Sequence, residues 1–182
     1  MEELYTTWKA IGVAGGDLSF FQDFFVKFYQ AFIEGDRWLQ YLNGVKTTLL
    51  VTALALILGI VLGVLVAMLR TAHDQQRPGH RNPILAVLNL ICKIYVTVIR
   101  GTPMMVQLLI MGFVIFASSR NFTMIGTLTL GINSGAYVSE IVRGGLMSVD
   151  KGQMEAGRSL GLNYMTTMRF IVIPQAIKAI LP

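Results

Sequence analysis

Residues 150–174, DKGQMEAGRSLGLNYMTTMRFIVIP, form the one polar, glycine-punctuated segment late in an otherwise membrane-like chain. Asp150 is suited to N-cap a short helix, and Gln153, three residues further on, completes the pattern of a capping box. Gly161 can adopt the left-handed conformation that ends such a helix. The pattern therefore predicts a helix of about three turns over residues 151–160.

The predicted helix has a small apolar surface, because Met154 and Leu160 fall near one face of it and charged side chains flank them. A surface of this kind suits the groove of a partner protein. Asn163 is placed to cap a second, more apolar helix that begins near Tyr164 and is kinked at Pro174. The segment thus predicts two helices with a hinge between them.

The same segment resembles the cytoplasmic loop signature of ABC importer permeases, in which Glu-Ala-Ala is followed by a Gly, nine residues, Ile, one residue and Leu-Pro. The matching positions are Glu155, Ala156, Gly161, Ile171 and Pro174. Two positions depart from the signature, since Gly157 replaces the second Ala and Ile173 replaces the Leu. The resemblance implies a coupling helix that docks on an ATP-hydrolysing subunit. The docking residues would be Glu155, Ala156, Gly157 and Gly161. The alternative is an amphipathic loop helix lying on lipid.

Bulk composition indicates a membrane protein with one helical bundle. Of the 182 residues, 54% are hydrophobic and 14% are charged, and the mean hydropathy is +0.61. The net charge of +5 comes from basic residues between apolar spans, which is typical of cytoplasmic loops and not of a nucleic-acid-binding stripe.

Cofactor chemistry is not expected in this chain. The sequence has no Walker-type phosphate-binding motif, so ATP and Mg²⁺ would be bound by a partner ATPase. The single cysteine, Cys92, excludes a disulfide framework and a cysteine-rich metal site. His73 and His80 share a basic loop, which does not favour a metal site there either.

The first 43 residues hold six acidic and three basic side chains, a balance that suits the non-cytoplasmic side of a membrane. Ser19 and Gln22 predict a capping box at the start of a helix. Phenylalanine recurs at every fourth position of that helix, from Phe20 to Phe32. The stripe predicts either an interfacial helix or a packing face against the bundle or a partner. We expect residues 1–43 to form an extracytoplasmic or interfacial segment and residues 44–182 to form the permease transmembrane domain.

The first membrane span is predicted from Thr47 to Leu69, 23 residues without a charge. Small residues recur at every fourth position and let another helix approach closely, so we expect this ridge to be buried in the bundle. The ridge consists of Ala55, Gly59, Gly63 and Ala67. The loop from Arg70 to Arg81 is basic, which places it in the cytoplasm by the positive-inside rule.

Residues 83–116 allow two interpretations, because Lys93, Arg100 and Pro103 interrupt them. As two spans, each would hold only about 15 residues, and the basic coupling segment would face outside. One long helix broken near residues 101–103 avoids both difficulties, and we expect that arrangement.

The piece VIRGTPMMVQLL, residues 98–109, resembles the polar amino-acid branch of these permeases, in which Arg-Gly-Thr-Pro is followed by apolar residues and Val-Gln. Gly101 and Pro103 indicate that backbone groups here are freed from helix bonding, which a bilayer tolerates only where protein or a water-filled cavity covers them. Thr102, between them, is a candidate for the substrate path. The alternative is a kink without a ligand role.

The next span, residues 124–147, is polar and glycine-rich, so it should not face lipid. Its one carboxylate is Glu140, and a charged group within a span normally faces a partner or a hydrated path. Glu140 is therefore a candidate for contact with the amino group of a substrate. Two polar neighbours would assist it, Asn133 and Ser134. The alternative is a salt bridge to Arg143, one turn later, or to Arg100.

The segment from Met165 to Pro182 would enter the membrane from inside and end in mid-span. Permeases of the family that the chain resembles generally carry five transmembrane helices. We therefore expect an all-α integral membrane protein of the type I ABC importer permease class, truncated at its C-terminus. It would contain about three complete transmembrane helices, the start of a fourth and a cytoplasmic coupling helix.

The resemblance implies the permease subunit of an importer for polar amino acids in a bacterial-type plasma or inner membrane. Its expected partners are ABC ATPase subunits, a second permease subunit, an extracytoplasmic amino-acid-binding protein and membrane lipid, and not nucleic acid. The alternatives are a non-transporting anchor or assembly subunit and a permease for another small solute. An enzyme is not expected, because the sequence has no HExxH motif, no nucleophile elbow and no paired carboxylates within a span.

Overall fold

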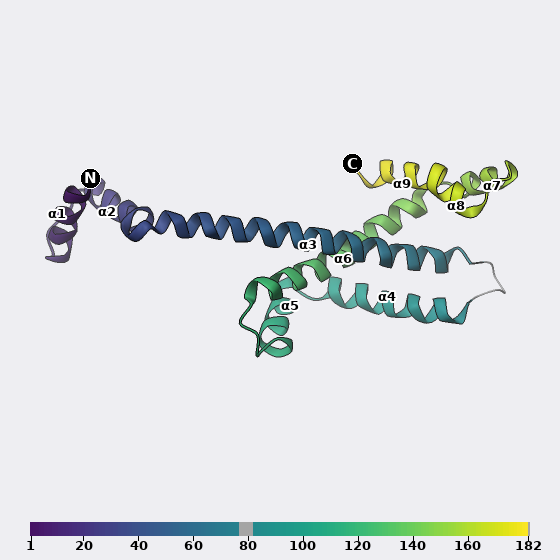
Figure 1. The fold of residues 1–182 in the computed structure, drawn as a ribbon, viewed down its shortest axis with the longest axis horizontal. Helices are drawn as coiled ribbons and strands as arrows, with labels where there is room; N and C mark the ends of the chain where they lie inside the picture. Colours follow the sequence, from purple (N-terminus) through teal and green to yellow (C-terminus); the bar gives the residue numbers. More distant parts are fainter. Residues whose placement is uncertain (77–81, 182) are drawn as a thin grey trace. The chain divides into compact units, whose positions relative to one another are not determined.

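The computed structural model describes residues 1–76 and 82–181, and every regular element within them is helical. Figure 1 labels the helices α1 to α9 in the order of the chain. Contacts between residues divide the chain into two units, Met1–Leu50 and Val51–Pro182. We describe each unit by itself.

The first unit contains a helical hairpin of α1 (Glu2–Val13) and α2 (Phe20–Phe32). The predicted capping box at the start of α2 is confirmed, because the Gln22 side chain accepts a hydrogen bond from Ser19 N at 2.9 Å. A short 3₁₀ turn, Glu34–Asp36, follows α2 and leads into α3.

α3 (Arg37–Asp74) is a single helix of 38 residues that includes the whole predicted first span. It runs through Arg70 to Asp74, where the sequence pattern predicted a loop, because no glycine or proline stops the helix before residue 78. The predicted ridge of small residues is confirmed as a buried face of α3. Its members are Ala55, Gly59, Gly63 and Ala67.

α6 (Phe122–Ser148) packs against this ridge at very short range. A Cβ atom added at Gly63 would lie 2.5 Å from Val138 Cγ1 and 3.0 Å from Gly135 O. In lipid, helices associate through such close packing, since burial from water contributes little between them. The glycines therefore set the distance between α3 and α6.

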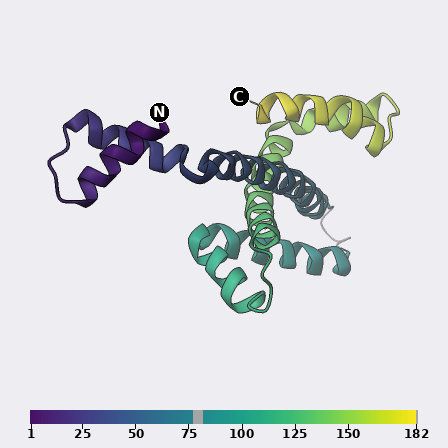
Figure 2. The same cartoon turned by 60° about the vertical axis from the view of Figure 1, so that its left-hand side comes forward.

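The predicted break in the second apolar region is confirmed. α4 (Pro83–Gly101) ends before Thr102, which is extended at φ −112° and ψ 140°, and α5 (Met104–Ile110) begins after Pro103. The two pieces do not form one long span, because the chain changes direction at the break (Figures 1 and 2). α4 alone holds 19 residues, since Asn82 caps it one residue before its start.

α5 continues into a π-helical turn, Met111–Ile115, and both stay at the end of the second unit where α4 finishes (Figures 1 and 2). α6 then runs back toward the C-terminal end of α3. Among the helices of the described residues, α3 and α4 are the two that are long and apolar enough to cross a bilayer. α6 is long enough, but its polar and glycine residues make it less apolar than α3 and α4.

Three helical pieces follow α7 (Lys151–Ser159) in one continuous run: α8 (Tyr164–Thr167), a π-helical turn (Met168–Val172) and α9 (Ile173–Ile180). The predicted cap of this run is confirmed, because the Asn163 side chain accepts from Thr166 N at 2.8 Å. A proline ring clashes with the carbonyl four residues earlier, and the wider π turn accommodates it. The disturbance expected from Pro174 therefore falls in the turn before it.

Candidate functional site

The coupling segment begins as the sequence predicts. Asp150 is the N-cap of α7, and its side chain accepts from Gly152 N at 2.6 Å. The second half of the predicted capping box is wrong. The Gln153 side-chain oxygen accepts instead from Gln175 Nε2 of α9, at 3.1 Å, so tertiary contact outweighs the local cap.

The end of α7 also follows the sequence pattern. α7 ends at Ser159, with Leu160 as its C-cap, and Gly161 follows at φ +76°, which confirms it as the left-handed residue. The predicted apolar surface of Met154 and Leu160 does not form. Leu160 is 77% exposed, whereas Met154 lines a pocket between α7 and other helices. The two side chains do not form one face.

Gly157 holds α7 against α8. It is buried, and a Cβ atom added there would lie 2.5 Å from Thr167 Cγ2 and 2.7 Å from Thr167 Oγ1. This contact explains why glycine stands in place of the second Ala of the loop signature. Glu155 lies two residues away, about 200° around the helix, and both Glu155 and Ala156 are exposed.

The four predicted docking residues are therefore divided between two faces. Glu155, Ala156 and Gly161 are exposed, whereas Gly157 packs against the chain's own Thr167. Gly157 fixes the rotation of α7, and that rotation leaves Glu155 exposed at the pocket beside α7.

A pocket of about 340 Å³ lies behind α7 and is also lined by residues of α3, α6 and α8. Tyr164 Oη donates to Gln75 Oε1 at 2.7 Å, which joins the start of α8 to the residues just after α3. Burial raises the pKa of the Tyr164 phenol, and the nearby Arg158 partly opposes that shift. The coupling segment thus contacts the end of α3 as well as α9.

Glu140 of α6 lies at the centre of an ionic cluster. Its carboxylate pairs with Arg70 of α3, accepts from Arg143 Nη2 at 3.2 Å and lies 4.0 Å from Arg100 Nη1 of α4. Both salt bridges expected as the alternative role of Glu140 are present. Arg70 is a further partner that sequence reasoning missed, because no local spacing relates two residues that are 70 positions apart.

The cluster extends to two more side chains. Arg143 Nη1 lies 3.8 Å from Asp74 Oδ2, and the Arg100 guanidinium lies 5.4 Å from the centre of the Tyr137 ring. Arg100 is the most accessible of the three arginines, with 43% of its side chain exposed. Three guanidinium groups against two carboxylates leave one excess positive charge, so the cluster can accept one further carboxylate.

The Gln107 side chain bridges the break between α4 and α5 by hydrogen bonds. Its Nε2 donates to Ile99 O at 2.7 Å, to Thr102 O at 3.1 Å and to Thr102 Oγ1 at 2.8 Å. Its Oε1 accepts from Asn133 Nδ2 of α6 at 3.1 Å. Gln107 itself is buried, and its amide satisfies two carbonyl groups at the break, Ile99 O and Thr102 O. In the sequence, this role could have been recognised from the Val-Gln pair of the motif at residues 98–109.

The predicted substrate-path residues fall into separate places. Thr102 and Asn133 meet through Gln107. Ser134 instead packs under α3, where a Cβ atom at Gly59 would lie 2.8 Å from Ser134 Cβ. Glu140 lies in the ionic cluster, two turns further along α6 than Asn133.

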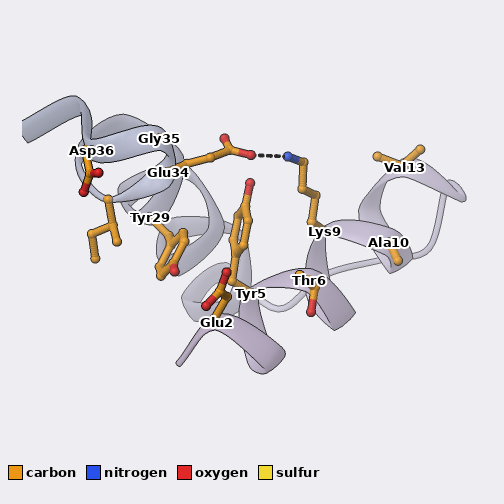
Figure 3. Close-up of a pocket in the computed structure, with 11 residues that line it drawn as sticks. Glu2, Tyr5, Thr6, Lys9, Ala10, Val13, Tyr29, Glu34, Gly35 and Asp36 are labelled. Carbon is orange, nitrogen blue, oxygen red and sulfur yellow. Dashed lines mark hydrogen bonds and ion pairs between the residues drawn. The ribbon is translucent and has the colours of Figure 1, made fainter.

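A second pocket, of about 580 Å³, lies in the α1–α2 hairpin (Figure 3). Lys9 Nζ pairs with Glu34 Oε1 across it at 2.6 Å, and the Tyr5 ring points toward that pair (Figure 3). The hydrogen bond that Lys9 donates to Glu34 raises the pKa of Lys9. Within residues 1–76 and 82–181, no three His, Cys, Asp or Glu side chains come together as a metal site.

Comparison with known proteins identifies a family. Residues 84–182 match the family described as the binding-protein-dependent transport system inner membrane component. A Rickettsia prowazekii protein named for a glutamine transport system permease is 38% identical over 144 residues, covering 78% of this chain and 61% of that protein. The arginine transport system permease protein of Corynebacterium glutamicum is 35% identical over 150 residues, covering 74% of this chain and 44% of its own length.

A solved structure is also similar. It is described as the crystal structure of an amino acid ABC transporter with histidines, and it matches with a TM-score of 0.61 and 37% identity. The match covers 79% of this chain and 66% of the solved chain. This chain therefore spans 61% of the Rickettsia prowazekii permease, 66% of the solved chain and 44% of the arginine permease.

Proposed function

The chain belongs to the family of binding-protein-dependent transport system inner membrane components, and on this basis we propose that it is the permease subunit of an ABC importer for polar amino acids. Relatives named for glutamine and arginine support the substrate class. The proposed location is a bacterial-type plasma or inner membrane, which the chain crosses several times. The proposed partners are ATPase subunits that bind ATP and Mg²⁺, a second permease subunit and an extracytoplasmic binding protein.

The orientation of α7 is the observation that carries the coupling role. Gly157 is packed on Thr167, whereas Glu155 and Ala156 are exposed, and Glu155 also lines the pocket beside α7. The segment is also tied to the end of α3 through Tyr164 and Gln75. We propose that an ATPase subunit docks on the exposed face of α7. Its movement on binding and releasing ATP would then shift α7 together with the spans that contact it.

For the substrate path we propose the polar side chains between α4 and α6. Arg100 is exposed beside Glu140, so it offers a positive group to the carboxylate of an amino acid. Glu140 would contact the amino group by exchanging one of its arginine partners for it. Thr102 and Asn133, linked by Gln107, would line the path nearer the outer side. Ser134 follows Asn133 in α6, and it would shape the path at that depth of the membrane by packing against α3.

The coupling role is tested by Glu155→Leu in the full protein, reconstituted with its ATPase and its binding protein. A bulky apolar side chain removes the outward charge of α7 without touching the Gly157 contact. We expect stimulation of ATP hydrolysis by the amino-acid-loaded binding protein to fall about tenfold. Glu155→Gln, which keeps the size of the side chain, is the matched control and should retain more of the stimulation. Unchanged stimulation in Glu155→Leu would contradict the docking role.

The sidedness of α7 is tested separately with a single introduced thiol. Ser159 is exposed near the end of α7, so Ser159→Cys in a Cys92→Ala background gives one accessible cysteine. A membrane-impermeant maleimide should label it only when it is applied from the cytoplasmic side. Labelling from the outer side alone would exclude contact between α7 and an ATPase.

A further inference from the structure

One face of α2 carries a continuous stripe of exposed phenylalanine side chains, which does not pack against α1. Phe20 is 78% exposed, Phe24 61%, Phe28 46% and Phe32 43%. Their spacing of four residues places them within about 120° of one another around the helix. Exposed aromatic area of this extent marks a surface that contacts something apolar.

The other faces of α2 already have partners. Toward α1, Tyr29 stacks on Tyr5 at 4.3 Å between ring centres, and Phe25 meets Trp8 edge-on at 5.4 Å. On a third face, Asp23 pairs with Lys27 at 2.7 Å. The hairpin is therefore complete without the phenylalanine stripe, and α2 has an apolar side and a polar side.

The stripe is continuous with the beginning of the first membrane span. The Phe32 ring lies 5.2 Å from the Tyr41 ring of α3, and Arg37 Nη1 donates to Gln30 O at 2.8 Å. The uncharged span starts at Thr47, six residues after Tyr41, which is about 9 Å along the helix. Tyr41 and the neighbouring Trp38 are exposed, as expected of aromatic residues at the surface of a bilayer.

We propose that α2 lies flat in the lipid interface on the extracytoplasmic side, with its phenylalanine stripe among the upper acyl chains. Its polar face and the hairpin pocket would then be turned toward water. The first 43 residues carry an excess of acidic groups, so the attachment depends on apolar burial and not on anionic lipid. This inference concerns the hairpin alone and does not depend on what the protein transports.

The test uses tryptophan fluorescence of the full protein in phosphatidylcholine nanodiscs. Both native tryptophans are replaced, as Trp8→Phe and Trp38→Phe, and a single tryptophan is introduced by Phe24→Trp or, as the matched control, by Asp23→Trp. The two positions are adjacent in sequence but belong to the apolar and polar faces of α2. Phosphatidylcholine brominated near the head-group end of its acyl chains serves as the quencher.

We expect the brominated lipid to quench Phe24→Trp about twofold more than Asp23→Trp, with no dependence on salt or on added anionic lipid. Phe28→Trp should be quenched as strongly as Phe24→Trp, and this second position controls for a local distortion at residue 24. Equal quenching at the two faces would overturn the proposal. So would protection of Phe24→Trp from both brominated lipid and aqueous acrylamide, because that result would place the stripe against protein.

Discussion

α3 and α6 meet in two different ways along the same pair of helices. In the middle of the pair, glycines bring the backbones together, and an added methyl group at Gly63 would have no room. Toward the end of α3, a charged side chain of each helix, Arg70 and Glu140, joins them within a network of five ionised groups. One contact depends on shape and the other on charge.

The difference decides which of the two contacts can be read from sequence. A repeat of small residues at every fourth position is a local property of α3, and it predicts a buried face without knowledge of the partner. A salt bridge is a property of two residues that are distant in the chain, so Glu140 alone could not indicate Arg70. The two contacts should also respond differently to substitution.

The largest effect is expected where charge is removed from the end of the pair. Glu140→Ala leaves Arg70 and Arg143 without their shared carboxylate, and it should lower the free energy of unfolding by about 3 kcal/mol. This cost is at the low end for a broken buried ion pair, because 22% of the Glu140 side chain is exposed. Denaturant titration of the protein in detergent micelles measures the change.

A matched variant separates the loss of a charge from the loss of a contact. Arg70→Met combined with Glu140→Met removes both charges and keeps the volume of the side chains. The double variant should be more stable than Glu140→Ala, because fewer unpaired charges stay buried. If the double variant were the less stable of the two, attraction between the charges would contribute more to stability than the avoided burial of unpaired charge.

A smaller effect is expected at the middle of the pair. Gly63→Ala places a methyl group 2.5 Å from Val138 Cγ1, and the separation that it forces should cost about 2 kcal/mol. Gly126→Ala in α6 is the control, because nothing lies within 4 Å of a Cβ atom there. The control should be neutral or stabilising by up to about 1 kcal/mol. Equal responses at the two glycines would show that shape does not hold α3 to α6.

The smallest effect is expected at the contact between α7 and α8. Gly157→Ala meets the methyl and hydroxyl groups of Thr167, and it should cost about 1 kcal/mol. In a Thr167→Ala background both opposing atoms are absent, so the same substitution should cost little. The difference between the two backgrounds, measured by thermal unfolding, is the coupling energy. A difference of zero would mean that α7 is held at some other point.

Much of the fold could be predicted from local signals. The caps at Asp150 and Asn163, the left-handed Gly161 and the break at Pro103 all depend on residues within a few positions of one another, and all are present. The extent of a helix was harder to predict. α3 passes beyond its apolar run through Arg70, because a charged residue does not end a helix as glycine or proline does.

The candidate site could be predicted only in part. Glu140 and Asn133 stand out because polar groups are unusual within a span, yet the sequence does not show that they belong to two separate networks. Gln153 has the right spacing for a capping box, but it bonds to Gln175 of a later helix. Gly157 was expected on the docking face, and its contact with Thr167 depends on how α8 folds back.

Gln107 has a consequence for how the interrupted helix behaves. Its side-chain amide binds one carbonyl group in the last turn of α4, Ile99 O, as well as Thr102 at the break and Asn133 of α6. α5 therefore cannot pivot about Pro103 without giving up bonds that no lipid molecule can replace. The interruption is therefore a fixed bend that is hydrogen-bonded to α6, and a movement of α6 would move α4 and α5 together with it.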